Sequence, residues 1–406
     1  MDARREIMET ALERFIRYAK IDTQSDENSN STPSAAKELD LSRLLLTELQ
    51  ALGLKAELDQ YGRVYSYLPG DKDLPTIGLN AHVDTALEVT GKNVQPQIHE
   101  NYDGGIIKLN EEYSMSPAEF PSLANHIGDT LITTSGDTLL GADDKAGIAI
   151  IMSTIAYYVE HPEIKHYPIA ILFTPDEEIG RGPEHFDAKK FGADWAYTID
   201  GANPECIDIE TFNAAHAIVK IYGVSIHPGE AKGKLINAIP LAFEFNSLLN
   251  PNDKPELTEG YEGFNHWNGI EGGNAEVTSY YIIRNHDAKK LEEQKMEFVT
   301  ALQIMKARYP KCKFSLTIED DYRNMKEVFD KDPRAIDHAV KVYKSLGIQP
   351  VHAPVRGGTD GATFSFLGCP TPNLGTGSYN HHGRFEYLSL RDFKNMLEIV
   401  KALTIG

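Results

Sequence analysis

The sequence is poor in cysteine: its 406 residues include only Cys206, Cys312 and Cys369. An odd number of cysteines without Cys-x-x-Cys spacing argues against a disulfide framework and is typical of proteins kept in a reducing compartment. We therefore expect a cytoplasmic location.

Long apolar runs and an excess of positive charge are also missing. No uninterrupted apolar stretch approaches the length of a membrane span, and the charged residues among positions 1–6 predict the start of an amphipathic helix rather than a signal peptide. The net charge is −20, whereas binding to nucleic-acid phosphates requires a basic patch. We expect neither a membrane nor a nucleic acid as partner.

What is present is the composition of a globular enzyme, with 41% hydrophobic and 25% charged residues. A chain of this length is long for one core, so two domains are expected. An α/β pattern of apolar strands and amphipathic helices changes near residue 209 to longer alternating strands, and it resumes near residue 326. The predicted domains are therefore a discontinuous catalytic domain over residues 1–208 and 326–406, and an inserted α+β domain over residues 209–325.

Individual elements follow from periodicity and apolar runs. In the first domain, strands are expected at 76–81, 169–173 and 196–199, with helices at 41–52, 146–159, 335–346 and 392–403. In the inserted domain, strands are expected at 217–224, 277–284 and 314–318, with helices at 235–249 and 287–308.

Five residues of metal-ligand type follow apolar runs or a glycine-rich stretch. They are His82, Asp143, Glu178, Asp200 and His382. Two imidazoles and three carboxylates suit divalent metals, zinc first and cobalt or manganese as substitutes. If Asp143 bridges, each of two metals receives three protein ligands and keeps a position for water, as catalytic sites do.

The spacing also predicts a mechanism. Residues two apart on a strand share a face, so Asp84 is expected behind His82, accepting its second ring N–H. Neighbouring side chains in extended backbone point in opposite directions, so one of Glu177 and Glu178 can bind metal while the other stays free beside water. We assign Glu177 as the general base and Glu178 as the ligand.

Each motif taken alone has a simpler interpretation. A His-x-Asp sequence is commonly a structural pair, paired glutamates are commonly a solvated helix face, and Asp143-Asp144 could simply open a helix. What favours a site is that the four early motifs all end predicted β-runs in a βα pattern, where open α/β sheets bind ligands.

Several motifs, in order along the chain, resemble the M20 metallopeptidase family. They are Gly-Ala-Asp-Asp-Lys-Ala-Gly (141–147), Thr-Pro-Asp-Glu-Glu-Ile-Gly-Arg-Gly (174–182), His-Pro-Gly-Glu-Ala-Lys-Gly (227–233), Arg-Gly-Gly-Thr-Asp-Gly-Ala (356–362) and His-Gly-Arg (382–384). The resemblance runs from the N-terminal helix to the C-terminus. The resemblance implies a mixed-sheet α/β zinc-peptidase catalytic domain with an inserted smaller α+β lid or dimerisation domain. It also implies that a homodimer through the inserted domain is possible.

The resemblance also implies roles for individual residues. One metal would take His82, Asp143 and Asp200, and the other Asp143, Glu178 and His382. Glu177 matches the family's base and Asp84 its orienting aspartate. An aspartate at position 200 is associated, within the family, with aminopeptidases rather than carboxypeptidases. His381 departs from the family pattern, which has a tyrosine there, and offers a second imidazole beside His382.

Three residues outside the metal ligands are candidates for substrate binding. Without the resemblance, His227 would be a solvent-facing turn histidine, Arg284 a surface salt-bridge partner and Arg356 a solvated loop residue. With it, His227 is expected to bind the oxyanion. Arg356 is expected to grip a carboxylate through its guanidinium, and Arg284 is the third binding candidate.

The predicted function is a two-metal aminopeptidase that releases the N-terminal residue of tripeptides. A water bridging two Zn²⁺ ions would attack the scissile carbonyl, with Glu177 as general base. The enzyme alternative is a dipeptidase or N-acyl amino acid hydrolase of the same family. The non-enzyme alternative is a peptide-binding relative that has lost catalysis, against which an unliganded Glu177 argues.

Overall fold

The computed structural model describes residues 9–406. The charged residues 1–6, on which the expectation of no signal peptide rests, lie outside the described residues. By its internal packing the chain divides into two units. Unit 1 comprises Met1–Ile209, Glu327–Ala353 and Thr359–Gly406, and unit 2 comprises Glu210–Lys326 and Pro354–Gly358. Unit 2 thus takes in a short segment around Arg356 that the sequence-based boundaries assign to the catalytic domain.

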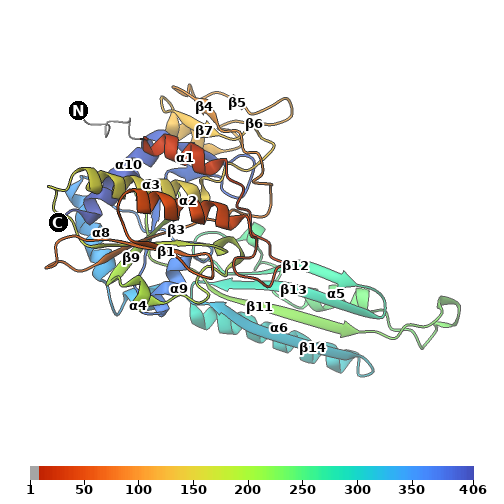
Figure 1. Ribbon diagram of the computed structural model, residues 1–406. Helices are drawn as coiled ribbons and strands as arrows, with labels where there is room; N and C mark the ends of the chain where they lie inside the picture. The colour runs from red at the N-terminus through yellow and green to blue at the C-terminus, as the bar shows by residue number, and fades with distance from the viewer. Residues whose placement is uncertain (1–8) are drawn as a thin grey trace. The chain divides into compact units, whose positions relative to one another are not determined.

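The centre of unit 1 is a seven-stranded mixed sheet (Figure 1). Its strand order is β1 (Ala56–Leu58), β2 (Val64–Leu68), β8 (Ile169–Thr174), β3 (Ile77–His82), β9 (Trp195–Gly201), β15 (Asn373–Gly375) and β10 (Ile207–Asp208). The four strands β8, β3, β9 and β15 are parallel. Their carboxyl ends therefore lie at one edge, as the sequence pattern predicts.

Helices cover both faces of this sheet (Figure 1), which explains why β3 and β8 are buried at every position. The larger core packs one face against α1 (Ala11–Ala19), α2 (Glu38–Ala51), α3 (Ala142–Glu160), α8 (Arg334–Ser345) and α10 (Leu390–Thr404). The smaller core packs the other face against α4 (Ala188–Phe191) and α9 (Asp360–Phe366).

A second small sheet in unit 1 was not predicted. Its order is β16 (Ser378–Tyr379), β17 (Tyr387–Ser389), β7 (Leu131–Thr133) and β4 (Gln97–His99), and the hairpin of β5 (Ile107–Lys108) and β6 (Ser114–Met115) packs beside it on a separate aromatic core. The small sheet joins residues before α3 to the segment that carries His382. It therefore brings distant parts of the sequence to one place.

Unit 2 is a four-stranded antiparallel sheet with two main helices. The order is β12 (Phe264–Gly272), β13 (Glu276–Asn285), β11 (Asn213–Tyr222) and β14 (Lys313–Tyr322), with α5 (Ala238–Ser247) and α6 (Ala288–Arg308). The alternating burial of β11 and β13 explains the alternating sequence pattern, and one face packs on both helices. All the predicted strands and helices of this unit are confirmed, whereas β12 was missed.

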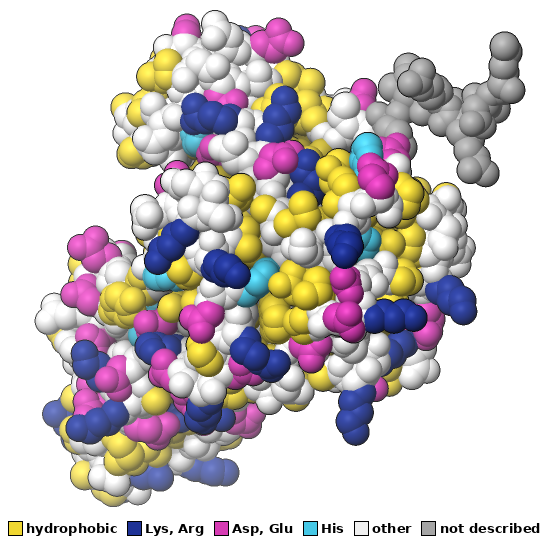
Figure 2. Space-filling model, turned by 90° about the vertical axis from the view of Figure 1, so that its left-hand side faces the viewer, with side chains coloured by type: hydrophobic (Ala, Val, Ile, Leu, Met, Phe, Trp, Pro, Cys, Tyr) yellow, Lys and Arg dark blue, Asp and Glu magenta, His cyan; other side chains and the backbone are white. Residues whose placement is uncertain are grey.

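Short elements complete the described chain. They are the 3-10 turns η1 (Pro121–His126), η2 (Glu177–Ile179), η3 (Pro228–Glu230) and η4 (Pro255–Leu257), and the helix α7 (Lys326–Phe329). Among the described residues, no helix is both long and apolar enough to cross a membrane. On the face drawn in Figure 2, acidic and basic side chains are intermixed.

Candidate metal centre

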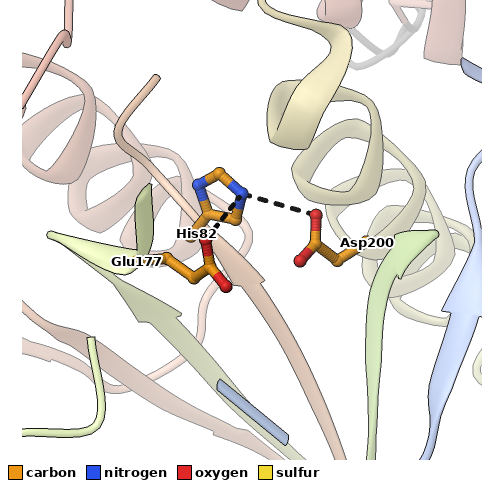
Figure 3. A group of neighbouring side chains, drawn as sticks. All are labelled: His82, Glu177 and Asp200. Atoms are coloured by element: carbon orange, nitrogen blue, oxygen red, sulfur yellow. Dashed lines mark ion pairs between the residues drawn. The ribbon is translucent and has the colours of Figure 1, made fainter. Parts of the chain in front are cut away.

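The register of the central sheet brings three of the predicted residues to one level. Asn80 on β3 pairs with Thr198 on β9, so His82 and Asp200, each two residues further along, lie side by side and on the same face. His82 also pairs with Thr174 at the end of β8, and Glu177 follows three residues later. Figure 3 shows the side chains of His82, Glu177 and Asp200 converging.

The distances define a compact cluster around His82. Its Nε2 lies 2.9 Å from Asp143 Oδ1, 3.4 Å from Asp200 Oδ1 and 3.9 Å from Glu177 Oε2. The His82 side chain is 1% exposed, whereas Asp143, Glu177 and Asp200 are 11%, 16% and 8% exposed, so a buried imidazole faces carboxylates that solvent can still reach.

A second imidazole closes the other side of Asp143. His382 Nε2 lies 3.2 Å from Asp143 Oδ2 and 3.0 Å from Glu178 Oε2. The two oxygens of Asp143 thus face two different histidines. This is the arrangement that a carboxylate bridging two ions would need.

His381 lies in the same neighbourhood. Its Nδ1 is 3.5 Å from Asp143 Oδ2, while its Nε2 is 2.8 Å from the hydroxyl of Ser378. His382 contacts two of the carboxylates and His381 contacts one of them. The assignment of His382 as ligand stays a prediction, with His381 as its alternative.

Asp84 supports the cluster differently from the prediction. The strand β3 ends at His82, so Asp84 does not continue it. His82 Nδ1 faces both the main-chain oxygen of Asp84, at 3.2 Å, and its Oδ1, at 3.4 Å. The carboxylate also accepts the backbone N–H groups of Glu177, at 3.0 Å, and Glu178, at 3.1 Å. Asp84 therefore holds His82 and the glutamate pair in one arrangement.

Two local expectations are wrong. The backbone at Glu177 and Glu178 is not extended but forms the 3-10 turn η2, entered through Asp176 with a left-handed φ of 61°. In addition, Asp143 does not end a strand of the central sheet. It lies at the beginning of α3, where Asp143 and Asp144 have non-helical backbone angles, and the preceding strand β7 belongs to the small sheet.

The sequence analysis missed two buried carboxylates next to the cluster. Asp144 accepts the backbone N–H of His82, at 3.2 Å, and that of Gly147, at 3.1 Å. Glu386 accepts three backbone N–H groups of the segment that leads to Asp143. The available signals were the doubled acid in Asp143-Asp144 and a glutamate directly before the apolar strand β17.

Crowding of buried carboxylates shifts their proton affinities. Burial raises the pKa of Asp200 to about 7 and that of Glu178 to about 7, and it raises the pKa of Glu177 well above its usual range. Burial alone would also raise the pKa of Asp143, but the three surrounding histidines outweigh it and hold that pKa well below its usual range. A divalent cation would relieve this repulsion by favouring the charged carboxylates.

One further observation tests whether the residues fit a metal. Glu178 Oε1 is buried and has no hydrogen-bond partner among the described residues. A buried oxygen of this kind is costly unless something outside the protein satisfies it. Together with two imidazoles and the surrounding carboxylates, this oxygen fits divalent-metal binding.

The ligand atoms can be grouped in more than one way. Two triplets lie close enough to share an ion, one of His82, Glu177 and Asp200 and one of His82, Asp143 and Glu178. His82 cannot serve both through one Nε2, because its Nδ1 faces Asp84. The geometry therefore leaves the division of ligands, and the role of Glu177 as base, as predictions.

The three candidate substrate-binding residues lie in unit 2. His227 is exposed and caps the turn η3, its Nδ1 accepting the N–H of Gly229. Arg284 donates to the main-chain oxygen of Ala215 and to Asp321. Arg356 donates to Gly260 O, Glu262 O and Thr258 Oγ1, and its guanidinium lies over the rings of Phe212 and Phe264.

Comparison with known proteins identifies the family. The model of peptidase family M20/M25/M40 matches residues 139–405. The chain belongs to this family. The resemblance seen in the sequence motifs is thereby confirmed, and so is the expected fold class.

Close relatives of this M20 chain share most of its length. It is 49% identical to Peptidase T of Desulfitobacterium hafniense (strain DSM 10664 / DCB-2) over 397 residues, which cover 97% of each chain. It is 48% identical to Peptidase T of Geobacillus thermodenitrificans (strain NG80-2) over 394 residues, covering 96% of each.

Solved structures show the same fold. A tripeptidase from Staphylococcus aureus superimposes with a TM-score of 0.78 and 21% identity, covering 97% of this chain and 96% of the other. A dinuclear metal-binding peptidase of the M20 family from Bacillus subtilis superimposes with a TM-score of 0.64 and 14% identity, with the same coverage.

Proposed function

We propose that the protein is a two-metal tripeptide aminopeptidase. The observation that carries this proposal is the position of Asp143, with one carboxylate oxygen 2.9 Å from His82 and the other 3.2 Å from His382. Both the 49% and the 48% identical relative bear the name Peptidase T, which supports the peptidase class.

The proposed division of ligands is the one that the family resemblance implies. One ion would be held by His82, Asp143 and Asp200, and the other by Asp143, Glu178 and His382. Zinc is the metal proposed, with cobalt or manganese as substitutes. Two divalent ions would supply Lewis acidity, which acidifies water and polarises a carbonyl oxygen.

The protein's own contribution to the reaction is proton transfer and positioning. Glu177 is held at the cluster by the hydrogen bond from its backbone N–H to Asp84. We assign its carboxylate to accept the proton of the attacking water and to pass that proton to the nitrogen of the leaving amine.

Unit 2 is proposed to supply substrate contacts. His227 would donate a hydrogen bond to the oxygen of the developing tetrahedral carbon, and Arg356, with Arg284, would bind the terminal carboxylate of the peptide. The contacts of Arg356 occupy both Nη1 hydrogens and one on Nη2. Counting only partners among the described residues, the Nε–H and the second Nη2–H remain for a carboxylate.

Two further properties are part of the proposal. A cytoplasmic location is supported by free Cys206, Cys312 and Cys369. A homodimer through unit 2 is supported by β12 and β14, which are the edge strands of its sheet.

Cleavage of a peptide panel tests the function. With added zinc or cobalt, the protein should release the N-terminal residue of an unmodified tripeptide faster than that of the matching dipeptide or tetrapeptide. Acetylation of the N-terminal amine should abolish cleavage. Faster cleavage of the acetylated substrates would instead indicate an N-acyl amino acid hydrolase, and no cleavage of any substrate would indicate a binding protein.

A further inference from the structure

A buried carboxylate outside the ligand set connects the two segments that carry Asp143 and His382. Glu386 is 1% exposed. Its Oε2 accepts the backbone N–H groups of Leu140 and Gly141, both at 2.8 Å, and its Oε1 accepts that of Asp143 at 2.9 Å. Both oxygens are therefore committed to one short stretch of backbone, which ends at the residue that faces both histidines.

The segment that carries Glu386 is a hairpin loop. Strands β16 and β17 pair antiparallel, and residues 380–386 connect them. Strand β17 also pairs with β7, so the end of the loop at Glu386 is anchored in the small sheet. Two hydrogen bonds lie within the loop, from Asn380 Nδ2 to Phe385 O at 3.1 Å and from Glu386 N to Gly383 O at 3.3 Å.

His382 has an unfavourable backbone conformation within this loop. Its φ is +62°, and that of Asn380 is +56°. Histidine and asparagine enter this left-handed region more often than most residues other than glycine, but it remains uncommon for both and persists where surrounding contacts enforce it. Among the described residues, Glu386 is the only residue of this loop whose side chain hydrogen-bonds to the backbone of Leu140–Asp143.

We propose that Glu386 is a positioning residue, which fixes Asp143 relative to His382 and thereby sets the affinity of the metal position that these two ligands share. This inference rests on the proposed two-metal function. Glu386 does not itself touch metal or substrate. It acts by joining the backbone at Asp143 to the loop of His382, so that Asp143 Oδ2 and His382 Nε2 are held 3.2 Å apart before any ion binds.

The chemistry of this contact requires a carboxylate. Three N–H donors point at Glu386, and a carboxylate offers acceptors on both oxygens. In Glu386→Gln the side chain keeps its size, but its amide group places N–H donors against at least one backbone N–H. That buried donor then loses its partner, and the segment must move to relieve the contact. Glu386→Asp keeps the charge but shortens the reach by one methylene group.

The test is a Co²⁺ titration of chelator-treated protein, followed by the visible absorption of bound cobalt and by calorimetry. Wild type should bind two ions. In Glu386→Gln, one step should weaken by roughly 10- to 100-fold, the range found when a group supporting a metal ligand is removed. The other step, whose site shares Asp143 but does not use His382, should weaken less. His382→Ala identifies the affected step, because it removes a ligand of the same position. Glu386→Asp should be intermediate.

Asp129→Asn is the matched control. Asp129 is another buried carboxylate with backbone donors, at Thr130 and Arg391, but it does not contact the Asp143 segment. It should lower the melting temperature while leaving both cobalt affinities unchanged. The inference is overturned if wild type binds two ions and both Glu386 variants bind them with wild-type affinities, or if both steps weaken equally. If Glu386→Gln does not fold, the cobalt affinities of Glu386→Asp alone test the inference. If wild type binds fewer than two ions, the proposed function fails instead.

Discussion

The candidate residues of the two units differ in how their polar atoms are satisfied. In unit 1, carboxylates and histidines crowd together in a buried cluster, and Glu178 Oε1 has no partner among the described residues. In unit 2, Arg284 and Arg356 already bind main-chain oxygens of their own unit, and His227 caps a turn in solvent. The cluster thus presents a buried acceptor to a ligand, whereas the three candidate residues of unit 2 have partners within that unit. Substitutions should therefore act on metal binding and chemistry in unit 1, and on substrate recognition in unit 2.

The largest effect is expected for Glu177. Glu177→Gln keeps the size of the side chain but removes its basicity, so kcat should fall by roughly 10²- to 10⁴-fold with both metals retained. Glu178→Gln is the matched control and should lose metal together with activity. Steady-state kinetics combined with elemental analysis measures both. Loss of metal in Glu177→Gln, with retention in Glu178→Gln, would mean that the two roles are exchanged.

His227 tests whether unit 2 takes part in the chemistry. His227→Ala should lower kcat by roughly 10²-fold and change KM much less, because the oxyanion that it contacts develops only in the transition state. Thermal unfolding should be unchanged, since the side chain is exposed. An unchanged kcat would mean that His227 only caps the turn η3 through its contact with Gly229.

Arg356 separates substrate binding from loop support. Arg356→Ala should raise KM for a tripeptide by roughly 10-fold, because hydrogen bonds to charged groups contribute about 1.5–3 kcal/mol. The variant should also show a smaller preference for the tripeptide with a free C-terminal carboxylate over the same tripeptide amide. Arg356→Lys should restore little of the wild-type KM or of the preference for the free carboxylate, because lysine lacks the planar guanidinium that binds a carboxylate through two parallel hydrogen bonds. If the melting temperature falls while the preference for acid over amide stays at the wild-type value, Arg356 is only a support for the loop at Thr258–Glu262.

A smaller effect on stability is expected from Asp208, which lies in unit 1 outside the ligand set. Burial raises the pKa of Asp208 to about 7. This pKa lies above the value in the unfolded chain, about 3.9. The protonated group therefore stabilises the folded state, fully below about pH 4. This contribution to the free energy of unfolding is lost as the pH rises through about 7. Asp208→Asn mimics the protonated form, so its melting temperature relative to wild type should rise between pH 5 and pH 8. Calorimetric scans of chelator-treated proteins measure this difference. A difference that stays constant with pH would contradict the assigned pKa.

Much of the fold could be predicted because apolar runs and alternation report directly on burial. The runs at 76–81, 169–173 and 196–199 became β3, β8 and β9, and the alternating residues of β11 and β13 line the core of unit 2. Strand β2 was missed although its Val-Tyr-Ser-Tyr-Leu run carries such a signal, whereas strand β12 and the strands of the small sheet lack one. Strand β12 contains Gly269 and Gly272, and the strands of the small sheet are only two or three residues long.

The membership of the metal cluster could be predicted because strand ends converge, but its details depend on contacts between distant residues. The left-handed turn at Asp176 replaces the extended backbone expected before Glu177 and Glu178. The bonds from Glu386 to the Leu140–Asp143 segment span more than two hundred residues of sequence, and no local pattern predicts them. Sequence patterns therefore located side chains that the structure brings together, whereas the contacts that support them required the structure.

The most direct test of the two-metal claim is the metal content of protein purified without chelator, measured by elemental analysis beside Asp143→Ala. Of the residues that the structure describes, Asp143 alone contacts both histidines of the proposed ligand set, at 2.9 Å for His82 and 3.2 Å for His382. Wild type should contain up to two divalent ions per chain, rising to two with added zinc, and Asp143→Ala should hold neither at full occupancy. One ion retained at full occupancy in Asp143→Ala, or no second ion in wild type with added zinc, would contradict a shared two-metal centre.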